Sequence, residues 1–365
     1  MQIRLERARL VSELMPMQGI VERRTTIPVL SHILLSASVG RLQLAATDLD
    51  VSLTSSCEAQ VNGEGAIAIQ ARKFSEIIRS LVDDQVSLDL VDDRQLKIRS
   101  GRSQFRIHGL APEDFPTLPK VGDEGAVDLE FSQLRSMIAK ILFAVSTEES
   151  RFQLNGALLK LKAKGMEIVA TDGHRLALIE NGLEEGREDD GVLVPRKALQ
   201  ELQRFEGDGK LRFVRGEHHL SFRLQERELT CRILEGTFPD YERVIARDND
   251  KKPIFDRKTL ADAVQRVALL TGERARAVRL DVAPGQTVIS ATNPDLGEAH
   301  EEVPCEYGGE EIKLGLNPDY LVQFLAAVET EKVRLELKDE NTQCVGFPVS
   351  GKDERYLCVI MPMRV

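Results

Sequence analysis

The stretch Leu42-Gln43-Leu44-Ala45-Ala46-Thr47-Asp48 is a short alternating strand that runs into a small polar triplet. The same triplet follows a similar strand at 170–172, and it returns as Ala-Thr-Asn at 291–293. The three copies stand 124 and 121 residues apart. Because self-similarity at a fixed period marks a repeated structural unit, the chain is predicted to contain three successive copies of one unit, which we call repeats 1 to 3.

The segments that flank the triplets keep the same spacing. Each triplet is followed by one of three segments, Gln70-Ala71-Arg72-Lys73-Phe74, Val194-Pro195-Arg196-Lys197-Ala198 or Leu316-Asn317-Pro318-Asp319-Tyr320. Apolar residues then recur at helical intervals, which predicts a helix, and alternating strands follow. An earlier helix is predicted in each repeat, at 9–21, 131–147 and 259–270. One repeat is therefore helix, strands, helix, strands.

This order predicts an α+β fold of three tandem domains, each with two helices packed on antiparallel sheets. The expected domains are 1–121, 122–248 and 249–365, because 119–125 and 246–253 are polar and contain Gly, Pro or clustered charge, as linkers do. Placed edge to edge, three such units could continue one sheet with paired helices on its inner surface. Two chains could then close into a six-domain ring with cyclic symmetry.

Composition limits the possible functions. The chain has 365 residues, 42% of them hydrophobic and 30% charged, which fits two or three ordinary domains. The first ten residues lack the apolar core of a signal peptide, and no apolar run approaches the ~18 residues that span a bilayer, so we expect a cytoplasmic protein with no membrane partner. The formal charge of −10 argues against tight nonspecific wrapping of DNA, although it permits a local basic surface.

The cysteines and histidines do not predict a metal or cofactor. The five cysteines are odd in number, far apart and never in a C-x-x-C pair, which favours buried free thiols. Only His218 and His219 are adjacent among the six histidines, and no Cys or carboxylate stands at zinc-ligand spacing beside them. We therefore expect no structural metal and no cofactor.

Several motifs match a known family. They include Ala170-Thr171-Asp172-Gly173-His174-Arg175-Leu176, Gly236-Thr237-Phe238-Pro239-Asp240-Tyr241-Glu242-Arg243-Val244 and Met361-Pro362-Met363-Arg364-Val365. With these, the chain resembles the bacterial sliding clamps, the beta subunits of DNA polymerase III, over its whole length. The resemblance implies a head-to-tail homodimer that encircles duplex DNA, with helices lining the channel. It also implies a non-catalytic processivity subunit of the DNA polymerase III holoenzyme, in the cytoplasm and associated with the nucleoid.

The family binds its protein partners in a hydrophobic cleft between the second and third units. By resemblance the cleft uses Leu154, Thr171, Gly173, His174, Arg175, Leu176, Pro239, Arg243, Val244, Val359, Met361, Pro362 and Met363. A concave apolar pocket with a few polar groups suits a short peptide with one or two apolar side chains. The alternatives are a plain tight turn at 171–176 and a frayed C-terminus. The segment 344–350 aligns poorly with the family, so no cleft residue is assigned there.

The partners implied by the resemblance are the alpha subunit of DNA polymerase III, the delta subunit of the clamp loader and other proteins with a clamp-binding motif. For the dimer contact, the resemblance points to Phe105 and Ile107 of the first unit against Leu269 and Leu270 of the third unit in the other chain. The alternative is that all four belong to the core of their own domains. Pairing across a dimer would protect strand edges that are otherwise open to aggregation.

Basic residues at five positions match DNA-facing positions of the family: Arg24, Arg72, Lys73, Arg196 and Lys197. Arg135, Lys140, Arg204 and Arg266 could add to the positive field. Any single one could instead be an ordinary solvated charge. Glu148 lies near a position where some family members carry a neutral DNA-contacting residue, so that contact is not carried over to this chain. Weak, sequence-independent phosphate contacts are what a sliding ring needs, because tight or base-specific contacts would stop its movement.

Two other classes of function remain open. Asp172 and His174 could form an acid/base pair of an enzyme, but no nucleophile elbow, phosphate-binding Gly-rich loop or metal set accompanies them. An interaction scaffold that does not bind DNA would suit the acidic net charge. The repeat and the motifs favour the sliding clamp over both.

Overall fold

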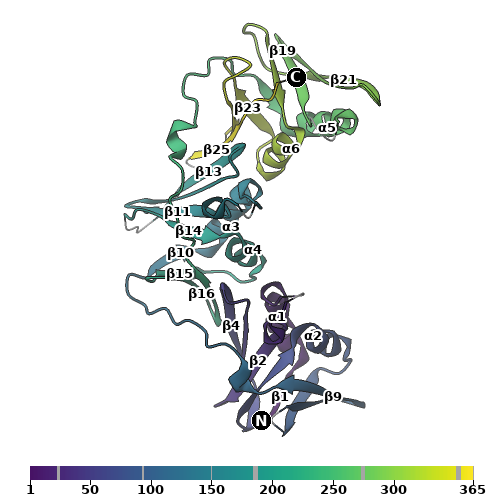
Figure 1. Cartoon of the computed structure of the whole chain (residues 1–365), viewed down its shortest axis with the longest axis vertical. Coiled ribbons are helices and arrows are strands. Elements are labelled where there is room, and N and C mark those ends of the chain that lie inside the picture. Colours follow the sequence, from purple (N-terminus) through teal and green to yellow (C-terminus); the bar gives the residue numbers. More distant parts are fainter. Residues whose placement is uncertain are drawn as a thin grey trace. The chain divides into compact units, whose positions relative to one another are not determined.

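We describe the protein from a computed structural model, which covers residues 1–22, 25–92, 94–148, 150–183, 188–272, 276–350 and 355–364. The described chain forms two compact units. The first comprises Met1–Leu134 with Lys197–Ile233, and the second comprises Arg135–Arg196 with Leu234–Val365. Helices and antiparallel strands alternate along the whole sequence (Figure 1), as the repeat predicts. No helix in the described ranges is long and apolar enough to cross a membrane.

The helices lie where the sequence predicts them, although the first helices of repeats 1 and 3 begin two residues earlier than predicted, at Arg7 and Arg257. They are α1 (Arg7–Ile20), α2 (Ala71–Ser80), α3 (Phe131–Ile141), α4 (Arg196–Arg204), α5 (Arg257–Val267) and α6 (Pro318–Ala327). At α2, α5 and α6 a side chain before the first turn accepts a backbone N–H and so caps the helix, namely Gln70, Asp256 and Asn317. The predictions of 131–147 and 259–270 were too long, because both helices tighten into 3-10 turns, at Leu142–Ala144 and Ala268–Leu270.

The first compact unit contains one thirteen-stranded sheet. In spatial order its strands are β10 (Val127–Glu130), β15 (Lys210–Arg215), β16 (His219–Leu224), β17 (Arg227–Arg232), β4 (Val51–Glu58), β3 (Arg41–Thr47), β2 (His32–Ser38), β6 (Gly65–Gln70), β9 (Ser103–Leu110), β8 (Gln95–Ser100), β7 (Gln85–Asp92), β1 (Gln2–Glu6) and β5 (Gln60–Gly63). Helices α1 and α2 lie side by side (Figure 1). Their buried faces, with Leu14, Met17 and Phe74, form the core beneath the sheet.

The second compact unit contains two sheets. The larger has the order β14 (Val192–Pro195), β11 (Gly156–Lys162), β12 (Gly165–Thr171), β13 (Arg175–Gly182), β25 (Arg355–Ile360), β24 (Cys344–Pro348), β23 (Lys332–Glu336) and β18 (Ile254–Asp256). The smaller has the order β21 (Gly297–Pro304), β20 (Gln286–Asn293), β19 (Val278–Ala283) and β22 (Ile312–Leu316). Helices α5 and α6 lie side by side (Figure 1).

The repeated triplet forms the same turn in repeats 1 and 2. In repeat 2 the Thr171 hydroxyl donates to the Arg175 carbonyl (2.6 Å), and Asp172 Oδ1 accepts the backbone N–H groups of His174 and Arg175. Thr47 and Asp48 make the matching hydrogen bonds in repeat 1, and Asn293 accepts one such N–H in repeat 3. These side-chain hydrogen bonds explain why the triplet recurs.

The residue after the triplet has a positive φ in the first two repeats. Gly173 has φ 89° and Leu49 has φ 83°. Glycine adopts this backbone at no steric cost, whereas leucine is strained in it. The strain at Leu49 shows that the turn is imposed by the hydrogen bonds of Thr47 and Asp48 rather than by the residue at its tip.

All five cysteines are buried and free, as the sequence predicts. Burial raises the pKa of the Cys57 thiol to about 11 and that of Cys344 to about 12. Thiols with such pKa values stay protonated near neutral pH, so these cysteines behave as small apolar core residues.

Candidate functional site

Strands β13 and β25 bring together the two ends of the predicted cleft, which are far apart in the sequence. Leu176 is paired with Val359 across these antiparallel strands. The segment beyond β25 is held by backbone hydrogen bonds, from Met361 N to the His174 carbonyl (3.0 Å) and from Met363 N to the Gly315 carbonyl (2.8 Å). The C-terminal segment is therefore an ordered neighbour of the 171–176 turn, and the alternative of a frayed end was wrong.

An apolar cluster lies on this part of the sheet, and we call it the β13/β25 cluster. Its buried members are Val169, Leu176, Leu178, Ile245, Val345, Leu357 and Val359. Half-buried side chains pack against it, namely Leu158, Phe238, Tyr241, Val244, Ala246 and Phe347. The segment 238–246, which we call the wall segment, contributes four of these half-buried residues and the buried Ile245. Apolar side chains that stay half exposed over a buried apolar floor can accept an apolar partner.

The remaining cleft residues surround this cluster with varied exposure. Leu154 and Thr171 are buried, whereas Gly173, His174, Pro239 and Arg243 are exposed and Met361, Pro362 and Met363 are half buried. Gly173 also faces the guanidinium of Arg151, where a Cβ atom would stand 2.5 Å from Nη1. The half-buried methionines and the wall segment give the cluster an adaptable edge.

Sequence reasoning missed several members of the cluster. Val345 and Phe347 belong to β24, in the segment 344–350 from which no residue was assigned. Leu178, Leu357 and Ile245 were missed as well. The available signal was the period-2 alternation of the apolar residues in β13 and β25, which predicts a shared face but does not say which strands pair.

Arg175 is held on all sides by protein groups. Its Nε donates to Asp172 Oδ2 (3.0 Å), and its two Nη atoms donate to Gln323 and to the Phe143 carbonyl. The guanidinium also lies 4.3 Å from the centre of the Tyr320 ring. With a side chain only 9% exposed, Arg175 fastens the 171–176 turn to α6 and to the turn after α3.

We expect Arg175→Lys to lower the free energy of unfolding of the second compact unit by about 2 kcal/mol. A lysine ammonium cannot make all the hydrogen bonds of the planar guanidinium and also stack on the Tyr320 ring. Urea unfolding measures this change. Arg243→Lys is the matched control, since Arg243 is 84% exposed and forms an exposed ion pair with Asp240. Equal stability of the two variants would contradict the bracing role of Arg175.

The predicted DNA-facing residues fall at the first turns of two helices. Arg72 and Lys73 start α2, with side chains 79% and 63% exposed, and both pair with Glu76. Lys197 starts α4 beside Arg196, but its ammonium binds Asp48 and the Ile20 carbonyl (2.8 Å). Arg24 lies outside the described residues.

The additional basic residues differ in accessibility. Lys140 is 5% exposed, and its ammonium lies 3.4 Å from Glu329, so the expectation that it adds to a surface field was wrong. Arg204 and Arg266 are exposed but are paired with Glu201 and Glu301. Glu201 is itself buried, whereas the pair of Arg266 with Glu301 is more exposed and exchanges partners at less cost, which leaves Arg266 the freer of the two to approach a phosphate.

Of the residues predicted for a dimer contact, Phe105 and Ile107 lie on β9, whereas Leu269 and Leu270 lie in the 3-10 turn after α5. Phe105 and Ile107 are half buried on β9, which pairs with β8 over its length but with β6 only at Gly109 and Leu110 among the described residues. In the second compact unit, Leu269 is 78% exposed in the turn after α5, and β21 ends the four-stranded sheet.

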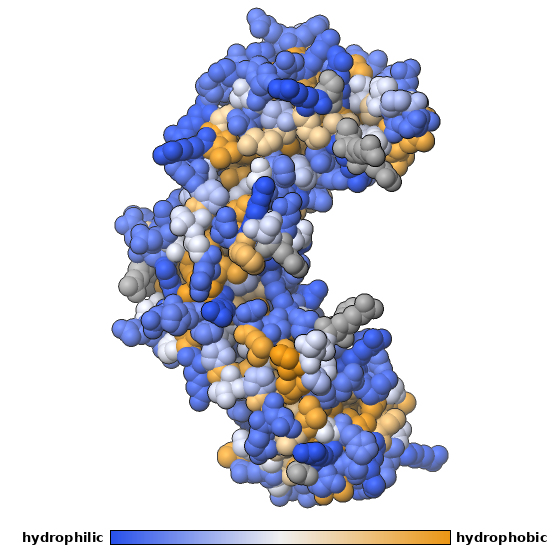
Figure 2. All heavy atoms as spheres, in the orientation of Figure 1, coloured by the Kyte–Doolittle hydropathy of each residue, from blue (hydrophilic) through white to orange (hydrophobic). Residues whose placement is uncertain are grey.

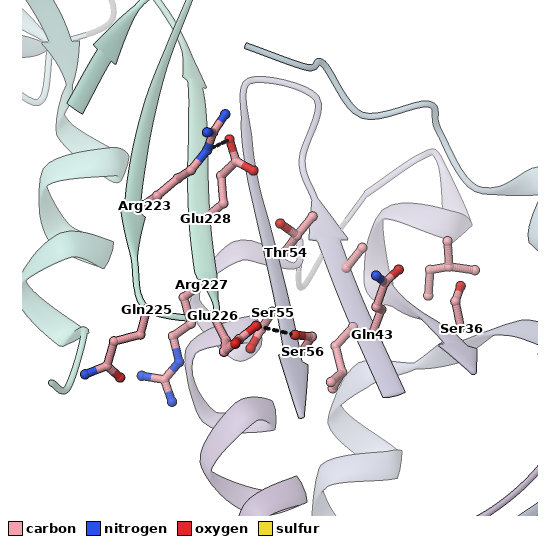
Figure 3. Close-up of a pocket in the computed structure, with 13 residues that line it drawn as sticks. Ser36, Gln43, Thr54, Ser55, Ser56, Arg223, Gln225, Glu226, Arg227 and Glu228 are labelled. Atoms are coloured by element: carbon pink, nitrogen blue, oxygen red, sulfur yellow. Dashed lines mark hydrogen bonds and ion pairs between the residues drawn. The ribbon is translucent and has the colours of Figure 1, made fainter. Parts of the chain in front are cut away.

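A different pocket lies at the seam of β4 and β17 in the first compact unit (Figure 3). It has a volume of about 370 Å³. Ten of its thirteen lining residues are polar or charged, and the charged groups are already paired, Arg223 with Glu228 and Glu226 with Ser56 and Arg41. Figure 3 shows Glu228 beside Arg223 and Thr54 on the neighbouring strand.

This pocket is the counterpart of the β13/β25 cluster one repeat earlier. With the offset of 124 residues, Thr54 corresponds to Leu178, and their cross-strand partners are Glu228 and Leu357. The same place in the fold therefore has polar side chains where β4 pairs with β17 and apolar side chains where β13 pairs with β25. Because only apolar surface gains free energy by burying an apolar side chain, the β13/β25 cluster is the better candidate to receive an apolar side chain of a partner. Figure 2 shows apolar atoms reaching an otherwise hydrophilic surface in both compact units.

Comparisons with known proteins agree with these features. Family models for the N-terminal, central and C-terminal domains of the DNA polymerase III beta subunit match residues 1–119, 128–240 and 242–364. Proteins named beta sliding clamp from Pseudomonas putida and Caulobacter vibrioides are each 38% identical, with 100% of both chains covered. The crystal structure of the Pseudomonas aeruginosa clamp bound to griselimycin is 36% identical with a TM-score of 0.94, again over 100% of both chains. The predicted family and tandem three-domain fold are confirmed.

Proposed function

We propose that this chain, which belongs to the DNA polymerase III beta subunit family of sliding clamps, closes with a second copy into a ring around duplex DNA and tethers the replicative polymerase through the β13/β25 cluster. The family is a non-catalytic processivity factor, so the pair Asp172 and His174 is not an enzyme site. In this chain Asp172 serves the turn, by accepting N–H groups and pairing with Arg175. The β13/β25 cluster is the observation that supports the tethering role most directly.

The proposed ring uses three domains per chain, at 1–121, 122–248 and 249–365. Head-to-tail closure would join the β9 edge of one chain to the β21 edge of the other. Two features support this pairing. Exposed Leu269 adjoins one edge and half-buried Phe105 and Ile107 lie on the other, and the charges are complementary, with Arg106 on β9 and Glu298 and Glu302 on β21. A head-to-tail contact joins two different surfaces of the same protein, and it produces a ring when the last copy meets the first.

The proposed DNA contacts are weak and independent of sequence. Arg72 and Lys73, with Arg24, Arg196 and Lys197, would face phosphates from the first turns of helices or near them. Each described lysine or arginine of this set except Arg196 has an acidic neighbour, Glu76 or Asp48, which moderates the attraction. A net charge of −10 moderates it further, so the ring would hold DNA by enclosing it and could still slide.

The proposed partners of the β13/β25 cluster are short peptide segments of the polymerase alpha subunit, of the clamp loader delta subunit and of other replication and repair proteins that share a clamp-binding motif. A segment with apolar side chains would cover Val244 and the methionines 361 and 363, while backbone groups of the 171–176 turn fix its orientation. This assigns the protein to the cytoplasm, with the DNA of the nucleoid.

A topological assay tests the ring. When the cognate clamp loader and ATP place the protein on nicked circular DNA, we expect it to remain bound through gel filtration in high salt and to leave after the circle is cut once, because a closed ring can escape only over an end. Leu269→Asp is a matched variant: it should be a monomer by native mass and should not be retained. Retention on linear DNA, or no retention on circles, would contradict the proposal and favour an interaction scaffold that does not enclose DNA.

A further inference from the structure

A buried carboxylate lies beneath the wall segment. Glu167, in β12, is only 1% exposed. It accepts a hydrogen bond from Lys162 Nζ (3.0 Å), and Arg355 Nη1 lies 3.8 Å away. The second hydrogen-bond donor to Glu167 is the hydroxyl of Tyr241, which comes from the wall segment. Because an uncompensated buried charge is very costly, each of these donors has a strong tendency to remain in place.

Tyr241 is the middle of the wall segment. It begins the 3-10 turn Tyr241–Arg243, whose backbone is closed by a hydrogen bond from Val244 N to the Tyr241 carbonyl (3.1 Å). Its ring packs edge-on against Phe238, with 6.3 Å between ring centres, and against the β13/β25 cluster. The position of Tyr241 therefore determines how Val244 lies over the apolar floor.

A second ionic contact supports the same segment. Arg355 Nη1 binds Glu242 Oε1 (2.9 Å), and Arg247 Nη2 binds Glu242 Oε2 (2.9 Å). Arg355 thus lies between Glu242 of the wall segment and Glu167 of the sheet. Arg355 and Glu242 are each about a third exposed, so these pairs are worth less than a hydrogen bond to the almost fully buried Glu167.

The counterpart of Glu167 one repeat earlier is Gln43, which is exposed and lines the polar pocket of Figure 3. A neutral, exposed amide there gives no buried charge for a linker tyrosine to bind. A hydrogen bond to a buried carboxylate therefore holds the wall segment at the β13/β25 cluster, and Gln43 offers no such carboxylate at the matching place in repeat 1.

We propose that Tyr241 is a positioning residue for peptide binding: its hydrogen bond to Glu167 fixes the wall segment over the β13/β25 cluster in the form that receives the partner. This inference rests on the proposed tethering function and specifies how the same site is pre-organised. A wall already in place spares the partner the cost of ordering it, so its loss acts chiefly on the lifetime of the complex.

The test uses Tyr241→Phe, which retains the ring and removes the hydroxyl. Tyr307→Phe is the matched control, because the Tyr307 hydroxyl donates to the Glu310 carbonyl at an exposed place. The probe is a fluorescent peptide copied from the clamp-binding segment of the cognate polymerase alpha subunit. We expect Tyr241→Phe to weaken its binding about fivefold, mostly through faster dissociation, and Tyr307→Phe to leave it unchanged.

Two further measurements separate positioning from general destabilisation. Hydrogen exchange of the Val244 N–H, which bonds to the Tyr241 carbonyl, should quicken in Tyr241→Phe and not in Tyr307→Phe. In Glu167→Gln the added Tyr241→Phe change should cost less than it does in the wild type, because the two residues act as one unit.

The outcomes distinguish the two proposals. If the wild type binds the peptide and Tyr241→Phe binds it equally well with unchanged Val244 exchange, the positioning role is overturned and the tethering function stands. If the wild-type protein does not bind the peptide, the tethering function fails and the positioning role fails with it.

Discussion

Val244→Asp is expected to weaken binding of the polymerase peptide by about 30-fold or more, which corresponds to the loss of a binding hot spot of about 2 kcal/mol. Val244 is half buried and packs against the β13/β25 cluster. A bound partner would close over this position, so a carboxylate there would lose its water without gaining an ion-pair partner. Fluorescence anisotropy with the labelled peptide measures the loss.

Val82→Asp is the matched control for Val244→Asp, because Val82 is 91% exposed and lies in the first compact unit. We expect it to bind the peptide as the wild type does. Truncation after Ile360 is an independent variant that removes the methionines and the hydrogen bond from Met361 N to the His174 carbonyl. Both Val244→Asp and the truncation should remain dimers by native mass. Wild-type affinity in either one would show that the binding site lies elsewhere.

Arg227→Met is expected to reduce the free energy of unfolding of the first compact unit by about 3–5 kcal/mol, as removing one partner of a buried ion pair does. Arg227 binds Glu13 through Nε (2.9 Å) and Nη2 (3.0 Å), and both side chains are only 14% exposed. The Ser55 hydroxyl also donates to Glu13. Without Arg227, the Glu13 carboxylate would remain buried with hydroxyl donors alone. Urea unfolding measures the change.

The double variant Glu13→Leu/Arg227→Met is the control, since an apolar pair of similar volume removes the buried charge altogether. It should recover most of the lost stability. If the single and double variants were equally unstable, packing of the long side chains rather than charge would be the cause.

The pH dependence of the free energy of unfolding is a second test of the ion pair between Glu13 and Arg227. Burial tends to raise the pKa of Glu13, but hydrogen bonds from Arg227 and Ser55 outweigh it and lower the pKa below the usual 4.5. A carboxyl with a lowered folded pKa contributes stability above its unfolded pKa and loses it as the pH falls through the folded value. Arg227→Met removes the main group that lowers this pKa, so burial would raise it, and the acid-dependent loss of stability that Glu13 gives the wild type should shrink or disappear, which acid unfolding curves would show.

The repeat and the helices could be predicted from the sequence because both depend on local pattern. The triplet recurs because Thr and Asp side chains satisfy one tight turn, and the helices are marked by apolar periodicity. Their ends were less predictable. The apolar residues Leu142 and Val145 continue the stripe of α3 beyond Ile141, yet the chain tightens into a 3-10 turn there. Strand β1 was not predicted, because five residues before a helix give little signal.

The candidate site was predictable only in part, since it depends on which distant strands pair. Motifs gave the 171–176 turn and Met361 to Met363, but they gave neither Val345 nor Phe347, which enter through the pairing of β24 with β25. Charge partners are equally invisible in sequence. Lys197 reaches Asp48, and Tyr241 reaches Glu167, across 149 and 74 positions of the chain.

Strands β4 and β17 join repeat 1 to repeat 2 by hydrogen bonds between residues that are far along the sequence from the peptide connection between the two repeats. Residues 51–55 pair with residues 227–231 in one antiparallel ladder. The sheet of repeat 1 thus passes into the strands of repeat 2 through backbone hydrogen bonds, whereas the peptide chain reaches them by way of 119–125. A force that pulls β4 away from β17 would act on their hydrogen-bonded ladder and on the ion pair of Glu13 with Arg227. It would not act on the connecting segment 119–125. The strand pairing therefore holds the two repeats together, and cleavage of the peptide connection at 119–125 would leave β4 paired with β17.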